Sequence, residues 1–124
     1  MMTNDRPVFL DLMQIRFPIP AIMSVGHRAS GILMVLAIPF LVYLLDLSLS
    51  GPEGFAAAKA VFSGWFAKLV MFVVLWALIH HLLAGIRYLL IDFDIFVDKE
   101  GGRQSATAVM VAAPVLALIV EILL

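Results

Sequence analysis

Cysteine is absent from this 124-residue sequence, and charged residues are scarce at 14%. The missing thiols exclude disulfide bonds, thiolate zinc sites, ligation of iron–sulfur clusters and covalent attachment of a c-type haem by this chain. Soluble proteins carry about 25% charged and about 45–50% apolar residues, whereas 64% of the residues here are hydrophobic. The composition therefore predicts an integral membrane protein.

The first twenty residues do not look like a cleavable signal peptide. They contain three prolines and four charged residues, namely Asp5, Arg6, Asp11 and Arg16. A secretory signal has instead one uninterrupted apolar region. We therefore expect this segment to stay on the protein and to precede the first membrane helix.

Three long apolar stretches lie at about 24–49, 66–92 and 105–124. Each supplies the roughly 20 helical residues that cross a bilayer core. In lipid, a helix satisfies its own backbone polar groups, so the stretches are predicted to be helices. The predicted fold class is an all-α membrane protein, with residues 1–124 as a single domain of three transmembrane helices.

The connections between the spans are short. In SGPEG, Pro52 and Glu53 suit the first turn of a short helix after a turn. The segment AAAKAVFSGWFAK then looks amphipathic, and we expect it to lie along the membrane interface with Trp65 as an anchor. Between the second and third spans, Gly101 and Gly102 are expected to form the break.

Lysine and arginine are distributed unequally between the two ends of the spans. One end carries Arg6, Arg16, Arg28, Arg87, Lys99 and Arg103, and the other carries Lys59 and Lys68. Positive residues favour the cytoplasmic side. We therefore expect a cytoplasmic N-terminus and a periplasmic C-terminus, which brings the unusual segments SVGHRASG (24–31) and HLLAGIR (81–87) to one membrane face.

His80 and His81 stand inside the second span, where ionisable residues are costly. Imidazole is the usual protein ligand of a b-type haem, but a histidine here equally suits a hydrogen bond to a neighbouring helix. Helical periodicity places Ala77, Ala84 and Gly85 on the face of His81. Small neighbours would let a flat macrocycle approach, so His81 is the expected ligand and His80, on a more crowded face, is the alternative.

Four more polar residues near this face have two interpretations each. Arg87 lies about 9 Å beyond His81 along the helix axis, and suits either a haem propionate or a snorkelling helix end. His27 and Arg28 suit a propionate or a quinone carbonyl, or simply anchor the helix on the positive side. Ser24 shares a face with Arg28 and could donate to a quinone, although a helix N-cap explains a serine equally well.

The segment RPVFLDLMQIRFPIPAIMSVGHRASG (6–31) resembles the N-terminal signature of the larger, cytochrome b membrane-anchor subunit of succinate dehydrogenase, respiratory complex II. That signature includes S-x-x-H-R-x-S-G. The second signature, H-x-x-x-G-x-R, is present as HLLAGIR and is followed by Asp92. The resemblance extends over essentially the whole chain and the three-helix plan.

The resemblance implies a hetero-oligomeric helix bundle in the bacterial inner membrane. A second membrane-anchor subunit would share one b-type haem, with His81 as one axial ligand. It implies that Ser24 and Arg28 line the ubiquinone site, and that His27 and Arg28 lie near the haem propionates. FAD and iron–sulfur clusters would belong to the flavoprotein subunit and the iron–sulfur subunit on the cytoplasmic face. No nucleic-acid partner is implied.

Three positions depart from the family pattern. Tyr88 stands where many relatives carry histidine, Gly26 where a bulkier apolar residue is commoner, and His80 adds a second histidine beside the expected ligand. The first departure puts in doubt any contact that a histidine makes there with the haem edge. The second would loosen packing beside the quinone pocket.

Three alternative functions stay open on the sequence. The chain could be the anchor of a quinol:fumarate reductase, since the direction of the reaction depends on potentials that it does not reveal. It could be a small membrane transport or proton-conducting protein with His80, His81 and Arg87 as a relay. Such a relay predicts polar residues along several helices, and the third span has almost none. It could also be an assembly anchor without a cofactor.

Overall fold

A computed structural model describes residues 15–124 of the chain. The described part consists of four helices and no strand: α1 (Ile19–Leu49), α2 (Pro52–Val61), α3 (Trp65–Asp92) and α4 (Lys99–Leu123). Three of them, α1, α3 and α4, are long and apolar enough to cross a membrane. The predicted all-α membrane fold with three transmembrane helices is confirmed. Asp5, Arg6 and Asp11 of the predicted cytoplasmic segment lie outside the described residues.

The first span begins five residues before the predicted residue 24. Pro18 is the N-cap of α1 and Pro20 lies in its first turn. Proline fits there because its fixed φ suits the helix and its missing N–H would have no helical partner. The helix therefore starts within residues 17–20, ahead of the predicted residue 24. Ser24 lies within α1 rather than before it, so its interpretation as an N-cap is wrong.

The third span begins at Lys99, six residues before the predicted 105, and the predicted break at Gly101 and Gly102 is wrong. Both glycines are helical, and the Asp98 carboxylate caps α4 by accepting a hydrogen bond from Gly101 N at 2.8 Å. The chain turns earlier, where Asp94 and Phe96 adopt positive φ angles of 60° and 65°.

The connection between α1 and α3 agrees with the prediction only in part. Pro52 and Glu53 form the first turn of α2, as expected. The helix ends at Val61, however, and residues 62–64 are not helical. Trp65 is the first residue of α3 and is 79% exposed. The predicted interfacial helix through Trp65 is therefore two separate elements, since Gly64 and the preceding residues leave the helix.

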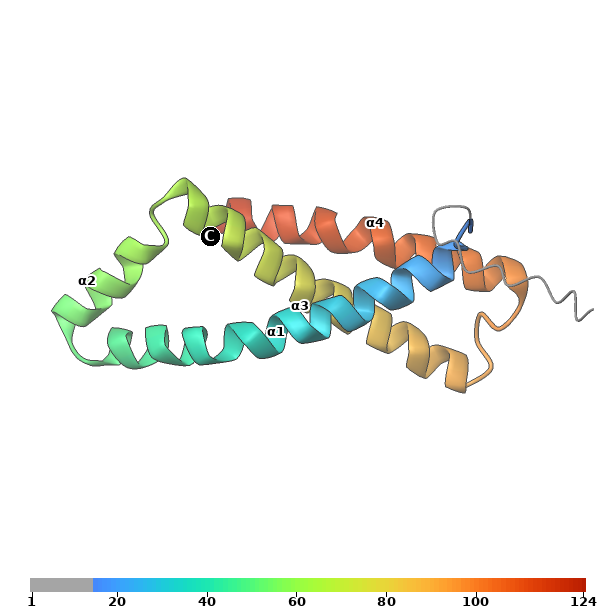
Figure 1. Cartoon of the computed structure of the whole chain (residues 1–124), viewed down its shortest axis with the longest axis horizontal. Helices are drawn as coiled ribbons and strands as arrows, with labels where there is room; N and C mark the ends of the chain where they lie inside the picture. Colours follow the sequence, from blue (N-terminus) through green and yellow to red (C-terminus); the bar gives the residue numbers. More distant parts are fainter. Residues whose placement is uncertain (1–14) are drawn as a thin grey trace, which may run out of the picture.

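Helix α3 packs against both α1 and α4, and α1 crosses it while α2 joins their far ends (Figure 1). The packed interior is built mostly from small side chains. Ala84 and Ala106 meet Met23 and Val109 in the core. Small residues let membrane helices approach closely and gain van der Waals contact. The large apolar side chains lie mainly outside, where lipid or another membrane subunit would cover them.

Arg87 joins α3 to α4 inside this interior. Its guanidinium Nε donates to Ser105 Oγ at 2.9 Å, and Nη2 donates to the Gly102 carbonyl at 3.0 Å. Only 6% of Arg87 is exposed. Hydrogen bonds from a charged donor are roughly twice as strong as neutral ones. The arginine therefore fixes the start of α4 against the end of α3.

Replacing Arg87 with alanine is expected to lower the stability of the assembled protein by about 2–4 kcal/mol, because two charge-assisted hydrogen bonds and buried packing are lost. Thermal unfolding of the detergent-purified assembly would measure this. Arg103→Ala is the matched control, since Arg103 is exposed and pairs with Glu100 at 3.1 Å on the same helix. Equal effects of the two substitutions would contradict the bridging role of Arg87.

Candidate functional site

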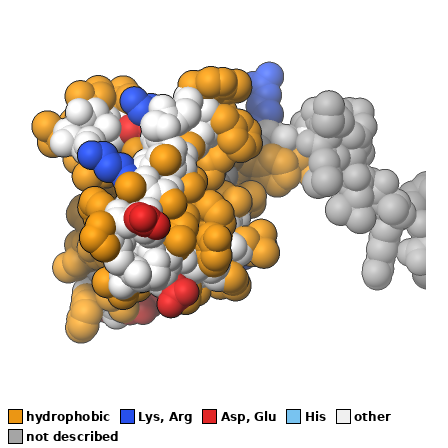
Figure 2. Space-filling model, turned by 90° about the vertical axis from the view of Figure 1, so that its left-hand side faces the viewer, with side chains coloured by type: hydrophobic (Ala, Val, Ile, Leu, Met, Phe, Trp, Pro, Cys, Tyr) orange, Lys and Arg blue, Asp and Glu red, His pale blue; other side chains and the backbone are white. Residues whose placement is uncertain are grey.

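The start of α1, the end of α3 and the start of α4 lie at one end of the molecule, away from α2 (Figure 1). The three buried polar or charged side chains of residues 15–124 are Ser30, His80 and Arg87. Ser30 and Arg87 lie in the parts of α1 and α3 nearest this end, and His80 lies near the middle of α3. Figure 2 shows the opposite end, where hydrophobic side chains surround a few charged ones. Polar chemistry within the spans is therefore concentrated on one side of the bundle.

The ring of His81 is held by α1 through one nitrogen. Its Nδ1 lies 3.1 Å from the His27 carbonyl and 3.2 Å from Ser30 Oγ, and Ser30 Oγ donates to the same carbonyl at 2.8 Å. A backbone carbonyl only accepts hydrogen bonds, so the contact assigns the proton of the neutral ring to Nδ1. Nε2 then carries a lone pair, and it has no hydrogen-bond partner among residues 15–124.

His81 lines an open apolar groove of about 520 Å³ on the surface of α1 and α3. The other lining residues are His27, Arg28, Gly31, Ile32, Val35 and Leu36. Gly31 brings the α1 backbone close to His81, since a Cβ at this position would lie 3.2 Å from His81 Cε1. The groove thus combines an anchored imidazole, an exposed guanidinium and an apolar wall.

His27 stacks on His81, with ring centroids 4.1 Å apart and planes 19° from parallel. Tyr88 meets the other ring, His27, edge-on at 5.3 Å. Aromatic contacts of this kind restrict the orientation of both partners. Tyr88 therefore contributes to the surroundings of His27 through its ring.

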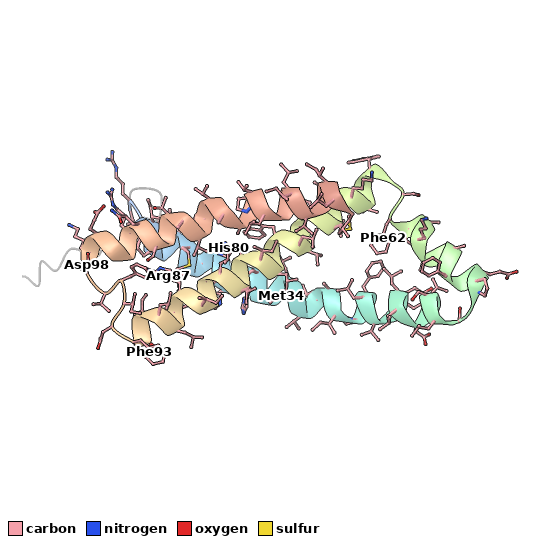
Figure 3. The ribbon with its side chains drawn as sticks, turned by 180° about the vertical axis from the view of Figure 1, so that it is seen from behind. Met34, Phe62, His80, Arg87, Phe93 and Asp98 are labelled. Atoms are coloured by element: carbon pink, nitrogen blue, oxygen red, sulfur yellow. The ribbon has the colours of Figure 1, made fainter. Side chains whose placement is uncertain are left out.

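The structure separates the remaining predicted site residues from this groove. Ser24 is half-buried on α1, one turn before Arg28, and does not line the groove. His80 is 1% exposed in the interior, and Arg87 reaches α4 (Figure 3). The structure brings together His27, Arg28 and His81, while Ser24 borders them in sequence.

Of the three small residues predicted beside His81, Ala77 and Ala84 face the packed interior, whereas Gly85 is half-buried and a Cβ there would have nothing within 4 Å. Both alanines are fully buried within the bundle and neither lines the groove. Ala84, for example, packs against Met23 of α1 and Ala106 of α4. The close backbone approach beside His81 comes instead from Gly31 on α1.

Ser30 and Gly31 contact His81 in the candidate site, and reasoning from the sequence did not single them out. Ser30 is fully buried and contacts His81 Nδ1, and Gly31 gives His81 its space. Their signal was present in SVGHRASG: Ser30 lies one helical turn after His27, and Gly31 one turn after both His27 and Arg28.

No cluster of three or more metal-ligating side chains occurs in the part of the chain that the structure describes. A closed metal site is therefore not built from residues 15–124 alone. His81 fits instead a single-ligand role, in which one ring nitrogen binds a metal and the other donates to a carbonyl that fixes the ring. A metal held by His81 in this way would take its other ligands from outside residues 15–124.

The comparisons with known proteins agree on one family. The family described as "Succinate dehydrogenase/Fumarate reductase transmembrane subunit" matches residues 2–120. The succinate dehydrogenase cytochrome b556 subunit of Coxiella burnetii is 39% identical over 114 residues, which cover 90% of each chain. The subunit of the same name from Paracoccus denitrificans is 31% identical over 116 residues, covering 94% of this chain and 89% of the relative.

Proposed function

Since this chain belongs to the family of succinate dehydrogenase/fumarate reductase transmembrane subunits, we propose that it is the cytochrome b membrane anchor of a succinate:ubiquinone oxidoreductase. In this role it binds a b-type haem and forms part of the quinone site. Succinate is oxidised on another subunit that carries FAD, and iron–sulfur clusters on a further subunit pass the electrons to the membrane. The observation that carries the proposal is the ring of His81, fixed through Nδ1 and open at Nε2.

In this proposal His81 would hold the haem iron from this chain, and a residue of the second membrane-anchor subunit would hold it from the other side of the interface. A bound b-type haem supplies one-electron redox chemistry. The fit rests on this chain's own residues. Ser30 and the His27 carbonyl hold the imidazole, Gly31 leaves room at its edge, and the groove wall is apolar. His80 stays an alternative ligand only formally, because protein surrounds it almost completely.

Arg28 and His27 provide the polar side of the same groove. Arg28 is exposed there and has no carboxylate partner among residues 15–124. Its guanidinium therefore stays available for an anionic or partially negative oxygen, such as a haem propionate or a quinone carbonyl. Arg87 has two donors engaged with α4, so a propionate would use the remaining ones.

Arg28 and Ser24 act on the quinone in this proposal. Both are hydrogen-bond donors one helical turn apart on α1. Fixed donors aimed at an oxygen stabilise the negative charge that develops there as the quinone is reduced. Arg28 would therefore hold the carbonyl oxygen, and the Ser24 hydroxyl would orient it or pass a proton to it.

The distribution of positive charge supports an orientation of the bundle in the membrane. Lys and Arg lie mainly where α1 and α4 begin and α3 ends, which favours the cytoplasmic side of a bacterial inner membrane. The flavoprotein and iron–sulfur subunits would dock on this face, and the C-terminus would lie in the periplasm. The large exposed apolar side chains of the spans suit contact with lipid and with the second anchor subunit.

A transport function fits the structure less well. Among residues 15–124, Ser30, His80 and Arg87 are buried between the middle of the bundle and one end, and Glu121 Oε2 is buried near the other end. Buried polar groups therefore do not run continuously along the bundle, whereas a proton or ion path needs them to. The reverse enzyme, a quinol:fumarate reductase, would use the same anchor residues. The family itself includes subunits of both enzymes, and the reaction direction depends on redox centres in other chains.

A reduced-minus-oxidised absorption spectrum of the purified complex tests the proposal. We expect the sharp bands of a six-coordinate b-type haem, at about one haem for each copy of this chain. The same preparation should oxidise succinate with ubiquinone as acceptor. A complex that contains this subunit and its partners in full amount but no b-type haem would contradict the proposal.

A further inference from the structure

His80 is the most deeply buried polar ring of the described chain and has no part in the proposed haem ligation. It lies midway along α3 and is 1% exposed (Figure 3). Trp76 covers it on its own helix, with ring centroids 5.3 Å apart. A buried imidazole in a membrane span is costly unless its contacts compensate. Its contacts therefore indicate what it does.

The single polar contact of His80 reaches α1. Its Nε2 lies 3.4 Å from the Met23 carbonyl, and the buried Nδ1 has no partner among residues 15–124. Since a carbonyl only accepts, the contact assigns the proton to Nε2. His81 makes the opposite choice and donates from Nδ1 to the His27 carbonyl. Two adjacent histidines of α3 thus hold two carbonyls that are one helical turn apart on α1.

The two carbonyls enclose the turn that carries the proposed quinone donor Ser24. Met23 directly precedes Ser24, and His27 directly precedes Arg28. Sliding α1 along α3, or rotating it, would break both contacts at once. The position of Ser24 and Arg28 relative to His81 is therefore tied to the contact made by His80.

Gly26 makes this contact sterically possible. A Cβ at Gly26 would lie 2.8 Å from His80 Nε2, a distance that real Cβ atoms essentially never show, and 3.2 Å from His80 Cε1, which is tighter than most real Cβ contacts. The ring is buried and held by Trp76 and Met23, so it has little room to move away. Histidine in this position at residue 80 therefore requires glycine at position 26.

We propose that His80 is a positioning residue. Its ring packs against Gly26 and donates a hydrogen bond to the Met23 carbonyl, and these two contacts fix the register of α1 against α3. With His81, it fixes where the turn from Ser24 to Arg28 stands beside the haem ligand. The inference rests on the proposed function for its consequences in quinone reduction. The coupling between Gly26 and His80 itself does not depend on any cofactor.

The test uses the assembled complex with His80→Leu and His80→Gln. Leucine removes the donor, whereas the glutamine amide can still donate to the Met23 carbonyl. We expect His80→Leu to raise the KM for a short-chain ubiquinone about fivefold and to shift the haem midpoint potential, with succinate oxidation by an artificial acceptor unchanged. His80→Gln should stay within about twofold of the wild type. Equal behaviour of the two variants would overturn the positioning role.

A double-mutant cycle tests the pair independently, including where His80→Leu fails to assemble. We expect Gly26→Ala to raise the KM about fivefold when His80 is present, but less than about twofold in a His80→Ala background. Gly64→Ala is the control, because a Cβ there has nothing within 4 Å. Additive effects of Gly26→Ala and His80→Ala would overturn the inference.

Failure of the proposed function would look different. A wild-type complex without haem or quinone reduction contradicts that function, and the cycle is then read from thermal unfolding midpoints. Coupling between Gly26 and His80 in those midpoints supports the register contact, and its absence overturns it.

Discussion

His81→Ala removes the b-type haem from the assembled complex: we expect less than about a tenth of the wild-type haem content. The reason is that, among residues 15–124, His81 is the one histidine whose ring is hydrogen-bonded through one nitrogen and lines the groove. Its Nδ1 is held by the His27 carbonyl and Ser30. Alanine leaves no donor atom at this position and a void beside Gly31. The measurement is the haem-to-protein ratio from the reduced spectrum of purified complex.

His80→Ala is the matched control, because it removes the adjacent histidine from the same helix. We expect this variant to retain its haem, since His80 is buried and its Nε2 contacts Met23 rather than the groove. Loss of haem in His80→Ala with retention in His81→Ala would show that the ligand assignment is wrong.

Gly31→Ala tests the same ligand, His81, through a residue of the facing helix α1. A Cβ there would lie 3.2 Å from His81 Cε1, so the imidazole must tilt by a few tenths of an ångström. We expect a haem that is still bound but has altered bands and a shifted potential. An unchanged spectrum would show that the ring has freedom at this point and that Gly31 does not determine its orientation.

Arg28→Leu slows ubiquinone reduction by about 100-fold while succinate oxidation by an artificial acceptor stays near the wild-type rate. Leucine keeps an apolar stem on the groove but removes every donor. Because Arg28 is exposed and pairs with no carboxylate among residues 15–124, its replacement is expected to cost little stability. The loss should therefore appear in quinone chemistry and not in assembly.

Two comparisons make this second result decisive. Ser24→Ala should show the same selectivity with a smaller loss, about tenfold, because a single neutral donor is removed. Arg103→Leu removes a cation near the same end, from the exposed side chain that pairs with Glu100, and should leave quinone reduction unchanged. Equal loss of quinone reduction and artificial-acceptor activity in Arg28→Leu would indicate an assembly defect and contradict the quinone role.

Local sequence rules failed at the helix ends and at the small residues. Pro18 and Pro20 stand before the predicted start of the first span at about residue 24, yet Pro18 is the N-cap of α1 and Pro20 lies in its first turn, where a helix tolerates proline. The sequence predicts a break at Gly101 and Gly102, yet they are helical because the Asp98 carboxylate caps α4 ahead of them. Ala77 and Ala84 share a helical face with His81, but helical periodicity could not tell which part of that face another helix covers.

The sequence by itself determined the membrane class, the three spans and the residue types of the site. These follow from composition, run length and the cost of charge in lipid, which act locally along the chain. Only the tertiary structure decided how His80 and His81 differ. Two adjacent imidazoles meet two carbonyls of α1 with opposite nitrogens, so one ring is enclosed and the other is left open. Which ring is enclosed depends on how α1 packs against α3 at Gly26 and Gly31. The residue pattern of α3 alone carries no information about that packing.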